Sequence, residues 1–304
     1  MPVRVGVIGI GYLGQHHVRI YSELEDAELV AVVDMVEKRA DAFAVKYGCE
    51  AYYDYRDIFN KVDALSIVTP TTTHYSIALD CIRAGKDILI EKPVTVSVKE
   101  ADELIAESEK SGCIIQVGHL ERYNPAVLAA YDMVREPRFI EAERLSPFLN
   151  RGTDVDVTLD LMIHDVDIVL SLVSSPVKEI KAVGTRVLTD KIDVAKAWIE
   201  FENGCIALFT ASRLSPEKQR RLRVFQRDSY LLLDYQNCEI RHYFRRGEEI
   251  LSDTIRPENK EPLKEELRDF IICVEERKRP KVSAVEGRDA LKIALDITKQ
   301  IKTG

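Results

Sequence analysis

The stretch that decides the fold is VRVGVIGIGYLGQHHVRIYSELEDAELVAVVD, which spans residues 3–34. It opens with a β-branched run typical of a strand buried on both faces, and it closes with a second apolar run at 29–33. Between the two runs lies a Gly-x-Gly-x-x-Gly turn, within which a helix begins. This order is the context that a dinucleotide-binding motif requires, whereas the glycines alone would also suit a plain βαβ packing unit.

Each glycine of the turn has a physical task. Gly9 permits the tight turn out of the strand, Gly11 lets the backbone approach a pyrophosphate, and Gly14 lets helix and strand pack closely. The N-terminus of the helix adds unpaired N–H groups and a positive dipole end for the phosphates. We therefore expect the whole turn to bind the cofactor, that is, Gly9, Ile10, Gly11, Tyr12, Leu13 and Gly14.

Asp34 ends the second strand, at the distance from the glycines where an acidic side chain accepts hydrogen bonds from the adenosine ribose. A carboxylate at this position repels a 2′-phosphate. The next residue is Met35 rather than an arginine that could bind such a phosphate. The sequence therefore predicts NAD as the cofactor, not its phosphorylated form.

Length and composition bound the class of protein. The chain has 304 residues, which is enough for two domains with separate cores. Its hydrophobic fraction of 46% and its charged fraction of 31% are ordinary for a globular enzyme. The net charge of −8 gives no electrostatic reason to expect nucleic acid or an anionic membrane as a partner.

The six cysteines are scattered and form no Cys-x-x-Cys pair. This spacing argues against a zinc site and a disulfide framework, and it suits reduced thiols. The first residues enter a strand at once, which leaves no room for a signal peptide, and no apolar run reaches membrane-spanning length. We expect a cytoplasmic protein without a metal site.

After Asp34 the pattern keeps alternating between helix and strand. We expect helices at 36–46, 73–84 and 99–110, and strands at 64–68, 87–90 and 114–117. This alternation predicts an α/β Rossmann domain over residues 1–120, with a doubly wound parallel sheet. Ligands bind such sheets beyond the carboxyl ends of the strands, so the strand ends are the places to search for a site.

One strand ends in Thr-Pro-Thr-Thr-Thr-His, residues 69–74. Capping of the next helix by Thr72 or Thr73 is the simpler interpretation. A cap needs only one threonine, however, and the segment has four. We therefore favour a loop that contacts the ribose and nicotinamide of the cofactor, with its contacts from Thr69, Pro70 and His74.

Another strand ends in Glu91-Lys92-Pro93. The proline restricts Lys92 to extended backbone conformations, so this lysine is less free to move than a lysine on a surface loop. An ion pair between Glu91 and Lys92 at the strand end is the alternative to a functional role.

Residues 160–173 predict a buried helix, because they are apolar on nearly all sides. The polar exceptions Asp160, His164, Asp167 and Ser171 recur at i, i+4, i+7 and i+11, which places them on one stripe. Buried polar groups need partners, and a stripe of them suggests the wall of a cleft. A core histidine with its own partners is one alternative. An Asp–His metal pair is another, but no further ligands stand at a useful spacing.

Residues 121–304 predict a second domain of the α+β class. We expect strands at 139–145, 177–187, 194–201, 206–212, 222–226, 230–234 and 239–243. Asn203-Gly204 suits a type I′ hairpin, so most of this sheet should be antiparallel. A last helix at 284–302 has the option to pack back toward the first domain.

Basic residues gather around one predicted hairpin of the second domain, namely Arg213, Lys218, Arg220, Arg221, Arg223 and Arg227. We favour a solvated or oligomer-facing surface for them over a contact with substrate phosphate.

The glycine-rich turn, Asp34, Thr69-Pro70 with His74, and Glu91-Lys92-Pro93 occur in the order found in the glucose–fructose oxidoreductase/inositol dehydrogenase (Gfo/Idh/MocA) family, which the whole chain resembles. The resemblance implies a Rossmann domain followed by a domain with a large, mostly antiparallel sheet. It implies NAD-dependent oxidation of sugars or cyclic polyols by a homodimer or homotetramer formed through that sheet.

The resemblance also implies residue roles. Lys92 matches the catalytic lysine, Glu91 a residue that lines the nicotinamide pocket, and Asp160 with His164 a catalytic Asp-x-x-x-His pair. We expect His164 to be the general base, Asp160 to orient it, and Lys92 to hold the substrate oxygen. The reverse assignment, with Lys92 as the base, stays open.

The substrate prediction rests on residues 119–125, which resemble the corresponding loop of UDP-N-acetylglucosamine 3-dehydrogenases in this family. The reaction would convert the 3-hydroxyl of the sugar to a ketone, and we expect substrate contacts from Arg122, Tyr123, Asn124 and Arg151. A dehydrogenase of a free sugar or polyol such as inositol is the alternative enzyme. The alternative from another class of protein is a regulator that senses NAD and has no catalytic activity.

Overall fold

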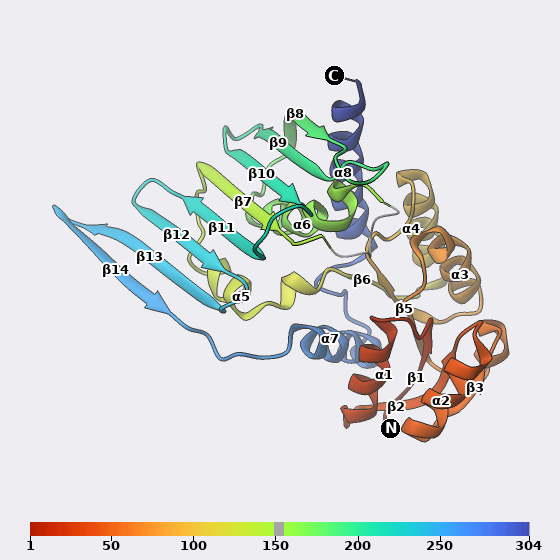
Figure 1. Ribbon diagram of the computed structural model, residues 1–304. Helices are drawn as coiled ribbons and strands as arrows, with labels where there is room; N and C mark the ends of the chain where they lie inside the picture. The colour runs from red at the N-terminus through yellow and green to blue at the C-terminus, as the bar shows by residue number, and fades with distance from the viewer. Residues whose placement is uncertain (149–154, 304) are drawn as a thin grey trace. The chain divides into compact units, whose positions relative to one another are not determined.

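The computed structural model describes residues 1–148 and 155–303 of the chain (Figure 1). Two compact units are present. The first comprises Met1–Leu120 with Glu261–Arg288, and the second comprises Glu121–Lys260 with Asp289–Gly304. The first predicted domain ends at the same residue as the first segment of unit 1. The structure differs from the prediction in returning residues 261–288 to this unit.

The sheet of the first unit has six parallel strands in the order β3-β2-β1-β4-β5-β6. The strands are β1 (Val3–Ile8), β2 (Ala27–Val33), β3 (Glu50–Tyr52), β4 (Ala64–Ile67), β5 (Asp87–Glu91) and β6 (Ile115–Gly118). The order reverses direction at β1, so a crevice for a ligand is expected beyond the carboxyl ends of β1 and β4. The predicted doubly wound parallel sheet is confirmed.

Helices surround this sheet. They are α1 (Gly14–Glu23), α2 (Glu37–Tyr47), the short η1 (Tyr55–Ile58), α3 (Thr71–Arg83), α4 (Val98–Ser111) and α7 (Pro262–Glu276). Helix α7 joins this unit because Leu267, Phe270 and Ile271 pack into the core that also contains residues of α1 and β1. Its sequence shows one apolar face, but a face alone does not say which sheet it covers.

The second unit is built on an eight-stranded sheet in the order β14-β13-β12-β11-β7-β10-β9-β8. All neighbours are antiparallel except β7 and β10. The strands are β7 (Phe139–Leu145), β8 (Val177–Thr185), β9 (Val194–Phe201), β10 (Ile206–Ser212), β11 (Gln219–Phe225), β12 (Ser229–Asp234), β13 (Glu239–Arg246) and β14 (Glu249–Ile255).

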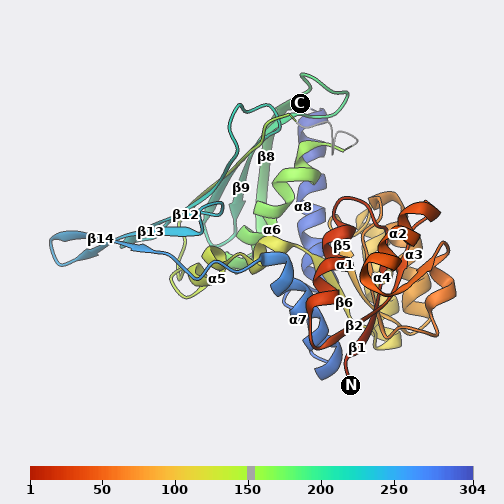
Figure 2. The same ribbon diagram turned by 60° about the horizontal axis from the view of Figure 1, so that its bottom comes forward.

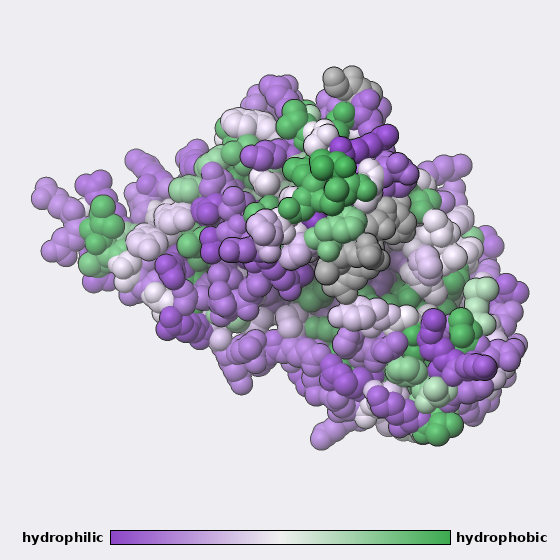
Figure 3. Space-filling view, in the orientation of Figure 1, coloured by the Kyte–Doolittle hydropathy of each residue, from purple (hydrophilic) through white to green (hydrophobic). Residues whose placement is uncertain are grey.

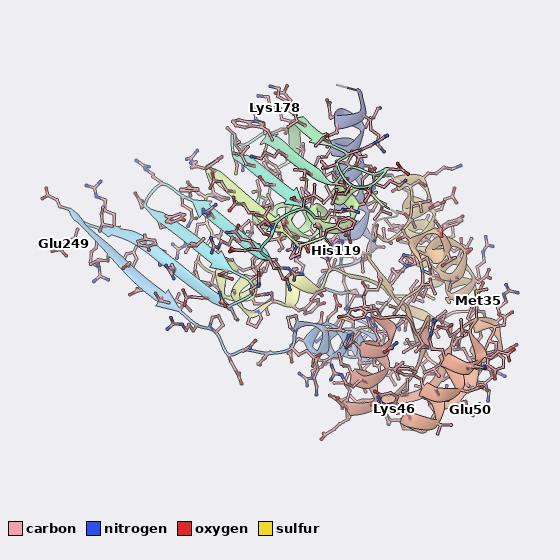
Figure 4. All side chains as sticks on the ribbon, viewed as in Figure 1. Met35, Lys46, Glu50, His119, Lys178 and Glu249 are labelled. Atoms are coloured by element: carbon pink, nitrogen blue, oxygen red, sulfur yellow. The ribbon has the colours of Figure 1, made fainter. Side chains whose placement is uncertain are left out.

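The predicted large, mostly antiparallel sheet is confirmed, but strand β14 was not predicted. It is an edge strand, and all of its residues are at least partly exposed, so its sequence lacks the alternation that marks a half-buried strand. It forms a long hairpin with β13 that ends near Glu249 (Figure 4). Ile250, next to Glu249, is 80% exposed. Figure 3 shows a hydrophobic patch near this end of the molecule.

The helices of the second unit lie on one face of its sheet (Figure 2). They are η2 (Leu120–Tyr123), α5 (Pro125–Tyr131), the π-helical turn η3 (Thr158–Met162), α6 (Ile163–Leu172) and most of α8 (Ala284–Thr303). The side chains of Ile140, Phe201 and Phe209 fill the core beneath them. No described helix of this unit covers the opposite face, which we call the open face of the sheet.

Three further observations concern the described residues. None of their helices is both long and apolar enough to cross a membrane. All six cysteines are free thiols. No group of three or more His, Cys, Asp or Glu side chains within the described ranges is arranged to hold a metal ion.

Candidate functional site

The glycine-rich turn is crowded at its two ends and open in its middle. A Cβ atom on Gly9, whose φ is 91°, would lie 2.6 Å from the carbonyl oxygen of Val68. A Cβ on Gly14 would lie 1.9 Å from the carbonyl oxygen of Gly9. A Cβ on Gly11 would meet no heavy atom of the described residues within 4 Å. Gly9 and Gly14 are therefore required for packing, because a side chain would clash there, whereas Gly11 faces free space that a pyrophosphate can enter.

The N-terminus of α1 is open to an anion. No side chain of the described residues caps it, and its first turn carries no acidic residue. The positive end of the helix dipole is therefore not neutralised by a protein carboxylate. Tyr12 is 71% exposed in the turn before the helix, whereas Ile10 is fully buried.

Asp34 is held in one orientation at the end of β2. Its Oδ2 accepts hydrogen bonds from the backbone N–H of Ile10 at 2.8 Å and from Arg39 Nη1 at 3.0 Å. Its Oδ1 accepts from the backbone N–H of Val36 at 2.8 Å. The neighbouring Met35 is 92% exposed and lies on the surface of the unit (Figure 4). A fixed carboxylate next to the glycine-rich turn fits an adenosine ribose. The residues present therefore fit NAD.

His74 connects the loops that follow β4 and β5. Its Nε2 lies 2.8 Å from the carbonyl oxygen of Thr69, and its Nδ1 lies 2.9 Å from that of Pro93. Burial lowers the pKa of His74, although the two carbonyls and the nearby Glu91 act in the opposite direction. His74 therefore bridges the loop after β4 and the loop after β5 through the backbone carbonyls of Thr69 and Pro93.

The threonines before α3 do not act as its cap. Helix α3 begins at Thr71, and no side chain within the described ranges caps its N-terminus. Instead, Thr73 Oγ1 lies 2.8 Å from both Thr69 Oγ1 and the carbonyl oxygen of Pro70. The capping interpretation of this segment is therefore wrong. Thr69 is partly buried and Pro70 is exposed at the carboxyl end of β4.

Glu91 and Lys92 stand at the carboxyl end of β5. Glu91 is 6% exposed, and its Oε1 lies 3.2 Å from Nε2 of His17 on α1. Lys92 is partly buried, and its peptide bond to Pro93 is cis. Sequence reasoning missed His17, although a histidine at a buried helical position is a signal that a polar partner is near.

The predicted polar stripe of residues 160–171 is split by a change in helix type. Asp160 lies in the π-helical turn η3, whereas His164, 9% exposed, lies in α6. Short π-helical segments are frequent at functional sites. The other two members have structural partners: Asp167 Oδ1 accepts from Arg122 Nη1 at 3.2 Å, and Ser171 Oγ lies 2.7 Å from the hydroxyl of Tyr131.

The predicted substrate contacts around residue 123 are largely buried. Arg122, Tyr123 and Asn124 are 8%, 2% and 5% exposed. Asn124 Oδ1 accepts from the backbone N–H of Ala126 at 3.0 Å and so caps α5, while its Nδ2 donates to the carbonyl of Tyr235 at 3.2 Å. These contacts hold Asn124 in place, and substrate contacts from the three residues stay a prediction. Arg151 lies outside the described residues.

A buried ionic network lies beneath α6. The guanidinium of Arg144 donates from Nε and Nη2 to the two carboxylate oxygens of Asp165, both at 2.9 Å, and from Nη1 to Glu121 Oε1 at 2.8 Å. Arg220 Nη1 donates to the same Glu121 oxygen at 3.0 Å. The two carboxylates raise the pKa of Arg144, which counteracts its burial, and the two arginines hold the pKa of Glu121 below its usual value.

The predicted basic cluster is not one surface. Arg220 belongs to the buried network, and Arg213 is 4% exposed and donates from Nη2 to the carbonyl of Val155 at 2.7 Å. Arg223 lies on the open face, where its Nη1 contacts Glu143 at 2.8 Å and Glu141 at 3.3 Å. Arg220 and Arg223 lie on opposite faces of β11 because successive residues of a strand point to opposite faces, whereas Arg213 follows β10.

The sheet order, the glycine-rich turn and the fixed Asp34 together define a dinucleotide-binding oxidoreductase domain. Residues 3–119 match the family model described as "Oxidoreductase family, NAD-binding Rossmann fold". Residues 127–229 match the Gfo/Idh/MocA C-terminal domain. The chain belongs to the Gfo/Idh/MocA family, and it is an NAD-dependent oxidoreductase.

Similar proteins cover the full length of the chain. A UDP-N-acetylglucosamine 3-dehydrogenase of Acidithiobacillus ferrooxidans is 36% identical over 97% of this chain and 96% of its own. The crystal structure under that name from the same organism superposes with a TM-score of 0.95, over 100% of this chain and 99% of that one. A scyllo-inositol 2-dehydrogenase (NAD(+)) of Bacillus subtilis is 28% identical over 99% of this chain and 95% of its own.

Proposed function

We propose that the protein oxidises the 3-hydroxyl of UDP-N-acetylglucosamine to the 3-keto sugar, with NAD as the oxidant. The observation that carries this proposal is the nearly full-length, 36% identical relative named as a UDP-N-acetylglucosamine 3-dehydrogenase, together with the TM-score of 0.95. The inositol dehydrogenases among the relatives have lower identity, for example 28%. The resemblance of residues 119–125 to the loop of such enzymes agrees with this choice of substrate.

Three residues carry the proposed chemistry. His164 accepts the proton of the substrate hydroxyl, Asp160 orients the imidazole, and Lys92 donates a hydrogen bond to the oxygen as negative charge develops on it. Bound NAD would supply the acceptor for the hydride that leaves the carbon bearing this hydroxyl. Lys92 follows a buried strand of the parallel sheet, at the edge where such sheets bind ligands, which supports its role.

The test of this function is turnover on a panel of UDP-sugars, free sugars and inositol, followed by the absorbance of the reduced cofactor. UDP-N-acetylglucosamine should have the highest kcat/KM. Replacement of Lys92 or of His164 by alanine should lower kcat at least about a hundredfold and leave NAD binding nearly unchanged. A preference for inositol would support the polyol dehydrogenase, and NAD binding without turnover of any compound would support the regulator.

We also propose that the protein is a homo-oligomer that associates through the open face of the eight-stranded sheet. Four aromatic rings lie in a row across four strands, namely Phe139, Phe225, Tyr230 and Tyr243, with successive centroids 5.4, 4.7 and 5.6 Å apart; the last three rings are stacked, and Phe139 is tilted against Phe225. Trp198 is 38% exposed on the same face. Exposed apolar surface of this kind is typical of an association site.

Light scattering after gel filtration tests this association. The unmodified chain should have the mass of a dimer or tetramer, and Trp198→Glu should lower that mass toward one chain of 34.6 kDa. An unmodified protein with the mass of one chain would contradict the proposal.

The six free cysteines support a cytoplasmic location, where thiols stay reduced.

A further inference from the structure

His17 and Glu91 form a buried pair that the proposed chemistry does not use. His17 lies one turn into α1, directly behind the glycine-rich turn, and is 0% exposed. Glu91 is the last residue of β5 and is 6% exposed. Nε2 of the imidazole lies 3.2 Å from Oε1 of the carboxylate. The contact therefore links α1, which carries the glycine-rich turn at its start, to β5, the strand directly before Lys92.

The carboxylate of Glu91 is confined on its other sides. Glu91 pairs in register with Gly118 of β6, and a Cβ on Gly118 would lie 2.8 Å from the carboxylate carbon and from both oxygens. The second oxygen, Oε2, accepts a hydrogen bond from the backbone N–H of Lys92 at 3.3 Å. The glycine thus provides the space that the carboxylate occupies, and the carboxylate contacts the main chain at Lys92.

The hydrogen-bonding groups determine which nitrogen of His17 carries the proton. An ionised carboxylate only accepts hydrogen bonds, so Nε2 must be the donor. Nδ1 is buried and has no hydrogen-bond partner among the residues that the structure describes. A neutral ring with its proton on Nε2 leaves only an acceptor unpaired, whereas an imidazolium would leave a buried N–H donor unpaired. The geometry therefore favours the neutral Nε2–H tautomer.

We propose that His17 is a positioning residue for Lys92. Its Nε2–H holds the carboxylate of Glu91, and that carboxylate holds the backbone N–H of Lys92 at the end of β5. Without the imidazole donor, the buried carboxylate loses a partner and turns away, and the lysine loses its orientation. This inference rests on the proposed role of Lys92 in catalysis.

Three replacements of His17 separate positioning from packing. His17→Gln places an amide N–H near the position of Nε2, whereas His17→Asn places one near Nδ1, and His17→Leu removes both polar atoms. We expect kcat to stay within about threefold of the unmodified enzyme in H17Q and to fall about ten- to a hundredfold in H17N and H17L. The KM for the sugar should change less than about twofold, because His17 is fully buried and acts on Lys92 only through the carboxylate of Glu91.

Two controls accompany these variants. His16→Leu changes the adjacent histidine, which packs edge-on against Tyr12 instead of Glu91, and it should leave kcat unchanged. Thermal unfolding of all variants shows whether loss of activity follows loss of stability. If His17 served packing alone, H17Q and H17N would lose stability and kcat in parallel, and the proposal would be overturned.

Nuclear magnetic resonance on the protein without cofactor gives a readout that does not depend on turnover. The backbone amide signal of Lys92 should move in H17L and H17N as it does in Glu91→Gln, and should stay in place in H17Q and H16L. An unmoved Lys92 amide in H17L would overturn the inference. Failure of the proposed function would be visible separately, as full turnover in Lys92→Ala or as no turnover of the sugar by the unmodified enzyme.

Discussion

Replacement of Arg144 by methionine tests whether the buried ionic network stabilises the second unit. Arg144 is 2% exposed and supplies two hydrogen bonds to Asp165 and one to Glu121. Methionine is also long and unbranched but offers no donor, so Asp165 becomes a buried carboxylate without its cation. Glu121 keeps its contacts with Arg220 at 3.0 Å and Asn124 at 3.3 Å.

The expected cost follows from these contacts. Removal of one partner from a buried ion pair costs about 3–5 kcal/mol, and the remaining partners of Glu121 place this case at the lower end. We expect a loss of about 3 kcal/mol in the free energy of unfolding at neutral pH, which corresponds to a fall of roughly 6–12 °C in Tm. The matched control is Arg223→Met on the open face, which should cost less than about 1 kcal/mol because its ion pairs are partly solvated.

The pH dependence of this loss has a definite sign. Burial raises the pKa of Asp165 even beside Arg144, and removal of the cation raises it further. A carboxyl group with a raised pKa in the folded state binds more protons there than in the unfolded state. The free energy of unfolding of R144M should therefore fall as the pH rises above about 4.

Urea unfolding monitored by circular dichroism, from about pH 4 to neutral pH, measures this effect. The deficit of R144M relative to the unmodified protein should be largest at neutral pH. The double variant R144M/D165N should recover part of it, because the uncompensated charge is gone. A stability of R144M equal to that of R223M at neutral pH would refute the reasoning, as would a deficit that does not change with pH.

Three further predictions concern single residues. Asp34→Ser should weaken NAD binding about tenfold and strengthen NADP binding at least about tenfold, because it removes the carboxylate and releases Arg39 to contact a 2′-phosphate. Titration calorimetry with both cofactors measures this change. An unchanged preference for NAD over NADP would contradict the prediction. Gly11→Ala should keep its Tm and lose NAD affinity, whereas Gly14→Ala should lose stability; equal Tm values would contradict this packing argument. The backbone and Thr189 donors around Asp193 lower its pKa to about 2. Asp193→Asn should therefore lower the free energy of unfolding by about 2 kcal/mol at neutral pH. In urea unfolding, this loss of stability should disappear as the pH falls through about 4 toward 2.

The first unit was largely predictable from the sequence. Strands β4, β5 and β6 are buried on both faces, and the strands alternate with amphipathic helices, so local patterns near Gly9, Asp34 and Lys92 are sufficient to place the strand ends. The assignment of α7 to this unit was not predictable, because it depends on contacts between segments more than two hundred residues apart, such as Lys264 with Glu23.

The second unit shows where local patterns fail. Arg122 and Asn124 have the residue types of a substrate loop, but tertiary contacts with Asp167 and Tyr235 bury them. Arg144 was not predicted as important, because a single arginine in an alternating strand usually faces solvent. The π-helical turn that separates Asp160 from His164 also leaves no clear mark in the sequence.

The most direct test of the central claim follows a labelled hydrogen. UDP-N-acetylglucosamine that carries deuterium at C3 of the sugar is incubated with the enzyme and NAD, and both products are analysed by mass spectrometry. The account predicts that the deuterium moves to the reduced cofactor and that the sugar becomes a ketone at C3. Reduced cofactor without deuterium, or deuterium retained in an unchanged sugar, would contradict it.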